Sequence, residues 1–273
     1  MPIIAFAIGA SFGSFANVIM TRLNALSLLT RSKCLSCGTQ IKAYDNIPIL
    51  SFIFLRGKCR SCESKFSSTY MWVELFMGMV GLLVWGRVSA MGLSMSLSLM
   101  HFALDIALFT ILMSISLYDI KHKIVPSQLS TALLFTGLLS VILRLYDHQD
   151  HYGLMVGHSL MYNAGMELLA GVITALPYAL LFFLSRGRWV GFGDVLVFLG
   201  VGWALGTVNG VYVFLYSVWV AGLFTIVWYM MEKKSGMMKI EIPFAPFIAI
   251  GTLIAYAYTS DMLSIHNMML FGI

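Results

Sequence analysis

Charged residues are scarce in this sequence. Of its 273 residues, 11% are charged and 59% are hydrophobic, and the mean hydropathy is +0.87. A soluble globular domain carries roughly 25% charged residues. The chain also lacks the short segments of alternating hydrophobicity that a membrane β-barrel would show. These absences argue against a soluble protein and predict an all-α polytopic membrane protein.

Long apolar stretches account for most of the chain. They run over 2–21, 68–86, 97–118, 126–145, 166–184, 193–207, 209–231 and 243–260. We therefore expect about eight transmembrane helices, or six or seven if the short sixth stretch re-enters the membrane. The expected domains are a first transmembrane helix (1–22), a small cytoplasmic loop domain (23–67) and a membrane-embedded domain (68–273).

The basic residues are divided unequally among the connections. With eight spans, 15 of the 17 lysines and arginines fall on one side, and Arg87 and Arg144 fall on the other. The positive-inside rule makes the richer side cytoplasmic, so both termini are expected outside. The net charge of +5 therefore reflects membrane topology and gives no indication of nucleic-acid binding. The expected surroundings of the protein are membrane lipids. Because no basic residue precedes the first stretch, we expect a retained helix and no cleaved signal peptide.

All four cysteines of the chain lie in the segment 23–67. They form two Cys-x-x-Cys pairs, Cys34 with Cys37 and Cys59 with Cys62, which are separated by 21 residues. Each pair can chelate from one tight turn, and this spacing is typical of a tetrahedral zinc site. Disulfides are disfavoured because cytoplasmic thiols stay reduced. We therefore expect a structural zinc ion, without an open position for a catalytic water, that supplies folding energy to this small loop.

Two aspartates lie where apolar stretches begin or end. Asp194 closes the Gly-Phe-Gly-Asp motif at 191–194, and Asp119 precedes a short basic turn. A carboxylate at membrane depth is costly, so its default interpretation is functional. Two neighbouring carboxylates share a proton, so that one can activate water while the other polarises a peptide carbonyl. The pattern predicts an acid/base pair at the cytoplasmic edge of the membrane, although spacing alone does not bring the two residues together.

Other polar residues at membrane depth have more than one interpretation. Glu74 and Asp105 could pair with a cation or with each other, and either could contact a substrate. Glu167 is expected at the outer interface. Asn17 favours an interhelical hydrogen bond over ligand binding. His122 could shuttle protons, but a basic turn at the headgroup boundary explains it as well.

Several longer motifs accompany these residues. They are GSFANVIMTRL at 13–23, the two cysteine pairs, the segment 46–78, the aspartate with its basic turn at 119–126, GFGDV at 191–195 and IPFAPFIAIG at 242–251. In combination they resemble the type 4 prepilin leader peptidases, a GxGD class of membrane aspartic proteases, over essentially the whole chain. The resemblance implies that Asp119 and Asp194 are the catalytic pair. It also implies cleavage of the basic leader of prepilins or pseudopilins, after a glycine, at the cytoplasmic face of the bacterial inner membrane.

Relatives with the cysteine-bearing loop typically also methylate the new amino terminus with S-adenosylmethionine. The sequence has no glycine-rich Rossmann fingerprint, so we expect a donor site built from the cytoplasmic loop and nearby helix ends, with its residues unassigned. Some positions depart from the family pattern: Leu196 and Val197 stand where a lysine is usual, Ser127 stands where an aspartate is frequent, and Ala245 replaces a glycine. None of these changes removes a catalytic aspartate.

Three other interpretations remain open from sequence. A presenilin-like intramembrane protease would share the aspartate motifs but lacks the cysteine pairs. A transporter or assembly factor using carboxylates for ion passage should place them mid-membrane, in broken helices or internal repeats, and no convincing repeat is visible. A docking module on a membrane anchor would leave Asp194 unexplained.

Overall fold

The protein is all-helical in the part of the chain that the structure describes. This computed structural model describes residues 1–23, 31–34, 36–152, 160–188, 190–231 and 242–271. Within these ranges there is no strand, and the β-structure is limited to two isolated bridges, Lys33 with Gln40 and Lys58 with Lys65. The prediction of an all-α protein is confirmed.

The long helices follow the predicted apolar stretches. The elements are α1 (Pro2–Arg22), η1 (Ala43–Asn46), α2 (Leu50–Phe54), α3 (Thr69–Ala90), α4 (Met95–His122), α5 (Ser127–Tyr152), α6 (Leu160–Ser185), α7 (Phe192–Leu205), α8 (Thr207–Met231) and α9 (Ala245–Phe271). In the described residues, six helices are long and apolar enough to cross a membrane: α1, α3, α4, α5, α6 and α8. With 14 residues, α7 is about 21 Å long, which is shorter than the roughly 30 Å of a bilayer core.

The chain is divided into two compact units, Met1–Ser98 and Leu99–Ile273. In the first, α1 and α3 pack closely through glycines. A Cβ added at Gly13 would lie 2.9 Å from atoms of Val73, Glu74 and Met77. Small residues allow helices in a membrane to approach in this way. The division into 1–22, 23–67 and 68–273 by function stays a prediction.

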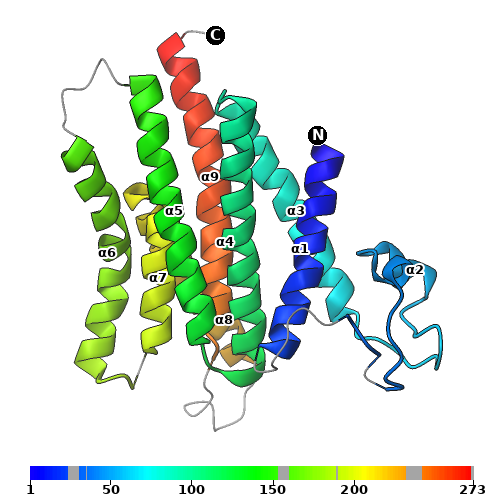
Figure 1. Ribbon diagram of the computed structural model, residues 1–273. Coiled ribbons are helices and arrows are strands. Elements are labelled where there is room, and N and C mark those ends of the chain that lie inside the picture. Colours follow the sequence, from blue (N-terminus) through cyan, green and yellow to red (C-terminus); the bar gives the residue numbers. More distant parts are fainter. Residues whose placement is uncertain (24–30, 35, 153–159, 189, 232–241, 272–273) are drawn as a thin grey trace. The chain divides into compact units, whose positions relative to one another are not determined.

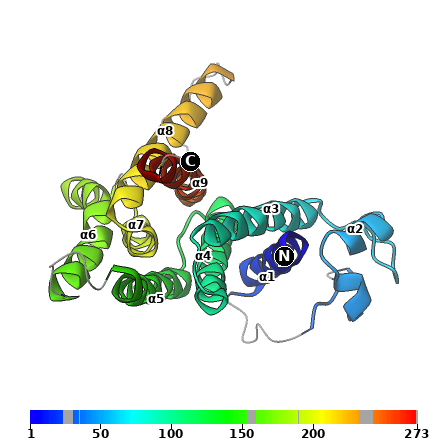
Figure 2. The same cartoon turned by 90° about the horizontal axis from the view of Figure 1, so that it is seen from above.

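In the second unit, α7 packs between α5 and α6 (Figures 1 and 2). A Cβ at Gly200 would collide with Leu133 of α5, and one at Gly202 would collide with Thr174 of α6. Helix α9 contacts α4 at two levels. Tyr256 donates a hydrogen bond to Asp105, and the backbone N–H of Ala245 donates one to Asp119. These contacts place the start of α9 next to the end of α4.

The C-terminus of the short helix α7 has a dedicated partner. Arg144 of α5 donates hydrogen bonds to the carbonyl oxygens of Trp203 and Ala204, each at 2.6 Å, and to Glu167 Oε2 of α6 at 2.7 Å. The last carbonyls of a helix have no partner inside the helix, and in a membrane they must be satisfied internally. Glu167 therefore belongs to a capping group, a role that its expected interfacial position did not indicate.

Candidate active site and metal centre

Asp119 lies in the last turn of α4 and is 5% exposed. Its Oδ2 accepts a hydrogen bond from the backbone N–H of Ala245 at 3.1 Å. Ala245 is the first residue of α9, and the N–H groups of a first turn have no acceptor inside their own helix. Asp119 therefore caps α9, where the positive end of the helix dipole stabilises a carboxylate.

Asp194 lies in the first turn of α7 and is 9% exposed. Gly191 is the N-cap of this helix, in an extended conformation. Like Asp119, Asp194 therefore lies at the positive end of a helix dipole. The buried side chain of Tyr178, from α6, lies near enough to interact electrostatically with Asp194.

The structure brings Asp119 and Asp194 together at one end of the Leu99–Ile273 unit, where α4 ends and α7 and α9 begin (Figure 1). The two carboxyl groups lie near enough for the charge of Asp119 to act on Asp194. The segment after Asp119 also contacts the glycine motif, because a Cβ at Gly193 would lie 2.6 Å from Cβ of Val125. The second glycine of the motif is thus required for this close approach. Two buried carboxylates in such an arrangement can share a proton and activate water.

Two contributors to this site were not predicted. No local sequence pattern predicts that Tyr178 lies near Asp194, because Tyr178 is inside an apolar helix. The N–H of Ala245 had a visible signal, because Pro243 and Pro246 mark the start of the last helix. That this N–H would bind Asp119 follows only from the tertiary structure.

The remaining polar candidates have structural partners. Asp105 accepts a hydrogen bond from Tyr256 Oη at 2.5 Å, and the ring of His122 packs on Tyr118 with centroids 4.4 Å apart. Asn17 Nδ2 donates to the carbonyl of Tyr70 at 3.4 Å, which is the expected interhelical contact. The letters Gly-Ala-Ser-Phe-Gly at 9–13 match the nucleophile elbow of serine hydrolases, but they lie inside α1, where Ser11 Oγ donates to its own helix. An elbow requires a strand-to-helix turn.

The four cysteines form one cluster in the Met1–Ser98 unit. One sulfur from each of Cys34, Cys37, Cys59 and Cys62 lies within 4.8 Å of the others, and all four thiols are free. The sulfurs of Cys34 and Cys62 are 3.8 Å apart. A tetrahedral ion with metal–sulfur bonds of about 2.3 Å separates its ligand sulfurs by about 3.8 Å. The cluster could therefore hold a tetrahedral metal ion.

The two cysteine pairs lie in turns of the same shape. The N–H of Cys34 donates to the carbonyl of Thr39, and that of Cys59 donates to the carbonyl of Ser64, both at 2.9 Å. Backbone N–H groups, first that of Cys37, lower the pKa of the Cys34 thiol to about 6. A thiolate is the form that binds metal, so this turn favours the metal-binding form of Cys34.

The residue after each pair has a positive φ, 71° at Gly38 and 54° at Glu63. This conformation costs a residue with a Cβ roughly 1–2 kcal/mol relative to glycine. We expect Glu63→Gly to stabilise the second turn by up to about 1 kcal/mol, measured as slower loss of metal to a competing chelator. Glu63→Ala, which removes the charge but keeps the Cβ, is the matched control. Equal metal retention by Glu63→Gly and Glu63→Ala would show that the backbone conformation is not limiting.

Comparisons with known proteins cover both halves of the chain. Residues 7–88 match the family model described as the Bacterial Peptidase A24 N-terminal domain, and residues 106–226 match the Type IV leader peptidase family. Each of these models covers less than half of the chain, and together they match most of it. No solved structure matches the chain.

Several relatives of similar length carry the name prepilin leader peptidase/N-methyltransferase. The protein of Stutzerimonas stutzeri is 28% identical, with 92% of this chain and 88% of the relative covered. That of Bacillus subtilis is 27% identical over 98% and 99%, and that of Vibrio cholerae is 26% identical over 89% and 91%. Both family models and these full-length matches agree with the motifs that carry the resemblance. The chain therefore belongs to the type IV leader peptidase family.

Proposed function

We propose that the protein is a membrane aspartic endopeptidase that removes the basic leader of type 4 prepilins or pseudopilins, with Asp119 and Asp194 as its catalytic residues. The observation that carries this proposal is the interaction of two buried carboxylates at the N-terminal ends of α7 and α9. Both aspartates fall within 106–226, the part of the chain that matches the leader peptidase family. Relatives over the full length are named prepilin leader peptidases.

The proposed cleavage needs one ionised and one protonated carboxyl group. The ionised carboxylate takes a proton from a water molecule while the water oxygen attacks the peptide carbonyl carbon. The protonated carboxyl group donates its proton to the carbonyl oxygen, which gives a neutral tetrahedral intermediate. When this intermediate collapses, a proton moves to the leaving nitrogen and the C–N bond breaks. The products are a leader with a new carboxyl group and a pilin with a free amino group.

We further propose that Cys34, Cys37, Cys59 and Cys62 bind a structural zinc ion. The separations of their sulfurs fit tetrahedral coordination, and the low pKa of the Cys34 thiol favours the ligand form. With four thiolates no coordination position is left for water, so the ion supplies folding energy and no catalytic group.

A second activity completes the proposal, N-methylation of the new amino terminus with S-adenosylmethionine. The full-length relatives are named N-methyltransferases as well as peptidases. When bound, this donor supplies a methyl carbon to the amine lone pair, the C–S bond breaks with its electrons remaining on sulfur, and the amine releases its extra proton to solvent.

The proposed location is the bacterial inner membrane, among its lipids, with the cysteine loop and the aspartates facing the cytoplasm and both termini outside. The distribution of lysine and arginine supports this orientation. It places the catalytic residues on the side where the basic leader of a prepilin is expected.

Mass spectrometry of a reconstituted reaction tests the proposed activity. Full-length enzyme in lipid nanodiscs is incubated with a model prepilin, and the product is sequenced from its amino terminus. We expect one cut at the leader junction and, with S-adenosylmethionine present, a product heavier by one methyl group. Cuts inside the apolar helix of the substrate would favour a presenilin-like protease instead. No cut with several prepilins would contradict the peptidase assignment.

Gly193 is expected to be essential for placing Asp194. In Gly193→Val, the new side chain would have to displace Val125, whose Cβ already lies 2.6 Å from the Cβ position. Displacement of a catalytic group by about 1 Å can cost about 100-fold in rate, so we expect a loss of that size in kcat for leader cleavage.

The matched control is Gly191→Ala in the same motif. Its nearest contact would be Asp194 Oδ2 at 3.6 Å, which is an ordinary van der Waals separation, so cleavage should fall by less than about tenfold. Partial recovery of the Gly193→Val rate in combination with Val125→Ala would confirm the steric cause. Full activity of Gly193→Val would contradict the described contact.

A further inference from the structure

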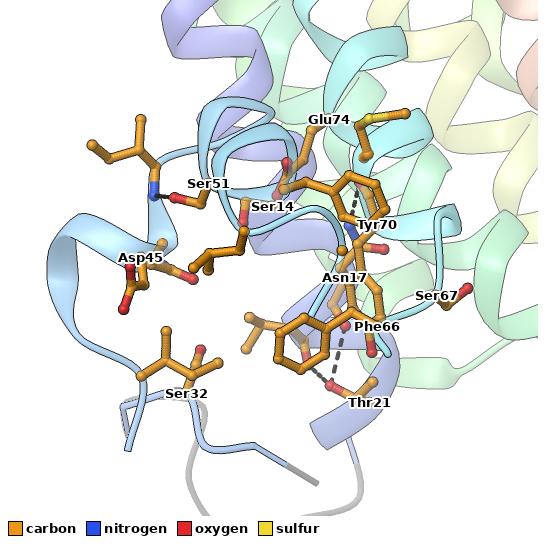
Figure 3. Close-up of a pocket in the computed structure, with 18 of the residues that line it drawn as sticks. Ser14, Asn17, Thr21, Ser32, Asp45, Ser51, Phe66, Ser67, Tyr70 and Glu74 are labelled. Atoms are coloured by element: carbon orange, nitrogen blue, oxygen red, sulfur yellow. Dashed lines mark hydrogen bonds between the residues drawn. The ribbon is translucent and has the colours of Figure 1, made fainter. Parts of the chain in front are cut away.

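A cavity of about 510 Å³ lies inside the Met1–Ser98 unit, between one face of α1, the first turns of α3 and the cysteine-bearing loop (Figure 3). Pockets for small molecules have volumes of roughly 300–1,000 Å³. Asp119 and Asp194 belong to the other unit. The cavity is therefore a second candidate site, which the peptidase mechanism does not use.

Glu74 of α3 brings a negative charge to the cavity wall. It is 9% exposed, and its Oε2 accepts a hydrogen bond from the backbone N–H of Ile49 at 2.7 Å. Ile49 has a φ of 64°, so this bond holds a strained turn of the loop against α3. The ion pairs found among the described residues do not include Glu74. Its charge can therefore serve a cationic ligand.

Aromatic and polar groups line the rest of the inner wall. Phe52, Phe66 and Tyr70 line the cavity, and aromatic rings can stack on a flat heterocycle or contact a cation. Ser14 and Asn17 of α1 add a hydroxyl and an amide to the same space (Figure 3). Because this wall presents polar groups beside the aromatic rings, an amphipathic ligand is favoured over a purely apolar one.

Basic side chains complete the lining: Arg22 at the end of α1, and Lys33 and Lys65 in the loop. They give the cavity positive charge for a carboxylate. The lining thus combines two acids, Glu74 and the Arg60-paired Asp45, with several bases, aromatic rings and hydrogen-bonding groups. A zwitterion that also carries a flat heterocycle and a second cationic centre matches all four features.

The two family matches divide the molecule in the same way. Both aspartates fall within 106–226, whereas every residue that lines the cavity, from Ser14 to Glu74, falls within 7–88. The relatives' names join a peptidase to an N-methyltransferase. If the first activity belongs to the aspartate-bearing part, the second belongs to the part that contains the cavity.

We infer that this cavity binds S-adenosylmethionine. Phe52, Phe66 and Tyr70 hold its adenosyl group, and Glu74 supplies the negative charge for its cationic end. The basic residues of the wall bind its carboxylate. This inference rests on the proposed methyl transfer and assigns that activity to a place in the molecule.

Direct binding of tritiated S-adenosylmethionine to full-length, metal-loaded enzyme in nanodiscs tests the assignment, with equilibrium dialysis as the readout. Ser14→Leu fills part of the cavity and should weaken binding at least tenfold. Ser11→Leu makes the same change three residues earlier on α1, at an exposed position outside the cavity, and should leave the dissociation constant unchanged. Glu74→Gln keeps an acceptor for Ile49 but removes the charge, and should weaken binding about tenfold. Metal content and melting temperature establish that each variant is folded.

The outcomes separate this inference from the proposed function. If wild type binds and transfers the methyl group but neither Ser14→Leu nor Glu74→Gln weakens binding, methyl transfer stands and the cavity assignment is overturned. If Ser14→Leu leaves donor binding unchanged and raises the KM for leader cleavage, the cavity holds the leader peptide, which also overturns the assignment. If wild type cleaves prepilin but neither binds the donor nor transfers the label, the proposed methyl transfer itself fails.

Discussion

Asp194→Asn and Asp119→Asn should each abolish leader cleavage, with a fall in kcat of at least about 10³-fold. An amide of the same shape can neither take a proton from water nor share one with its neighbour, and a positioned acid or base typically contributes about 10²–10⁴-fold. In Asp119→Asn the amide oxygen can still accept the hydrogen bond from Ala245, so the start of α9 should stay in place. The measurement is the initial rate of cleavage of a model prepilin at equal amounts of inserted enzyme.

Asp105→Asn is the matched control for Asp119→Asn. Both residues lie on α4, and the amide at 105 can still accept the hydrogen bond that Tyr256 donates. Because Asp105 has a structural partner 14 residues before the proposed site, its variant should cleave within about threefold of wild type. If Asp105→Asn lowers the cleavage rate as much as Asp119→Asn does, the loss at both positions would reflect reduced stability of the protein and not the loss of a catalytic group.

Removing the metal should unfold the cysteine loop. Among the described residues of 31–67, the buried side chains are those of Cys34 and Cys59, so the loop has no hydrophobic core of its own. Structural zinc contributes an apparent 10–16 kcal/mol in small domains, far more than surface contacts such as the Arg60–Asp45 ion pair. We expect about one zinc ion per chain in wild type and none in the double variant Cys34→Ser with Cys59→Ser.

Limited proteolysis reports whether the loop is folded. Cleavage within the loop should be at least about 100-fold faster in the double cysteine variant and in chelator-treated wild type. Ser61→Ala, an exposed change inside the second turn, should keep both zinc and protection. A loop that stays protected after complete removal of zinc would show that its fold does not depend on the metal.

Local patterns in the sequence were sufficient to predict the helices and the cysteine cluster. Hydropathy located the membrane helices because each is apolar along its whole length. The spacing within each Cys-x-x-Cys pair determined the cluster because the ligands of one turn are adjacent in the chain. The short sixth stretch was also visible, and it became α7, which ends at Leu205 with its carbonyls bound by Arg144.

Contacts between distant segments could not be predicted. Asp119 and Asp194 are 75 residues apart, and their proximity depends on the packing of α7 between α5 and α6. The hydrogen bond from Ala245 to Asp119 joins residues 126 positions apart. The pairing of Arg144 with Glu167 is similarly remote from any local motif. The cavity in the Met1–Ser98 unit could not be predicted either, because its lining comes from three separate segments.

A double-mutant cycle on the two aspartates tests the central claim most directly. Cleavage rates of wild type, Asp119→Asn, Asp194→Asn and the double variant are measured on one prepilin in nanodiscs, with a quenched assay that detects rates down to the uncatalysed background. Residues that act as one unit show strongly non-additive losses, so we predict that the double variant is no slower than the slower single variant. If the fold-loss of the double variant equals the product of the two single losses, a shared catalytic pair is contradicted. The same holds if either single variant cleaves within tenfold of the wild-type rate.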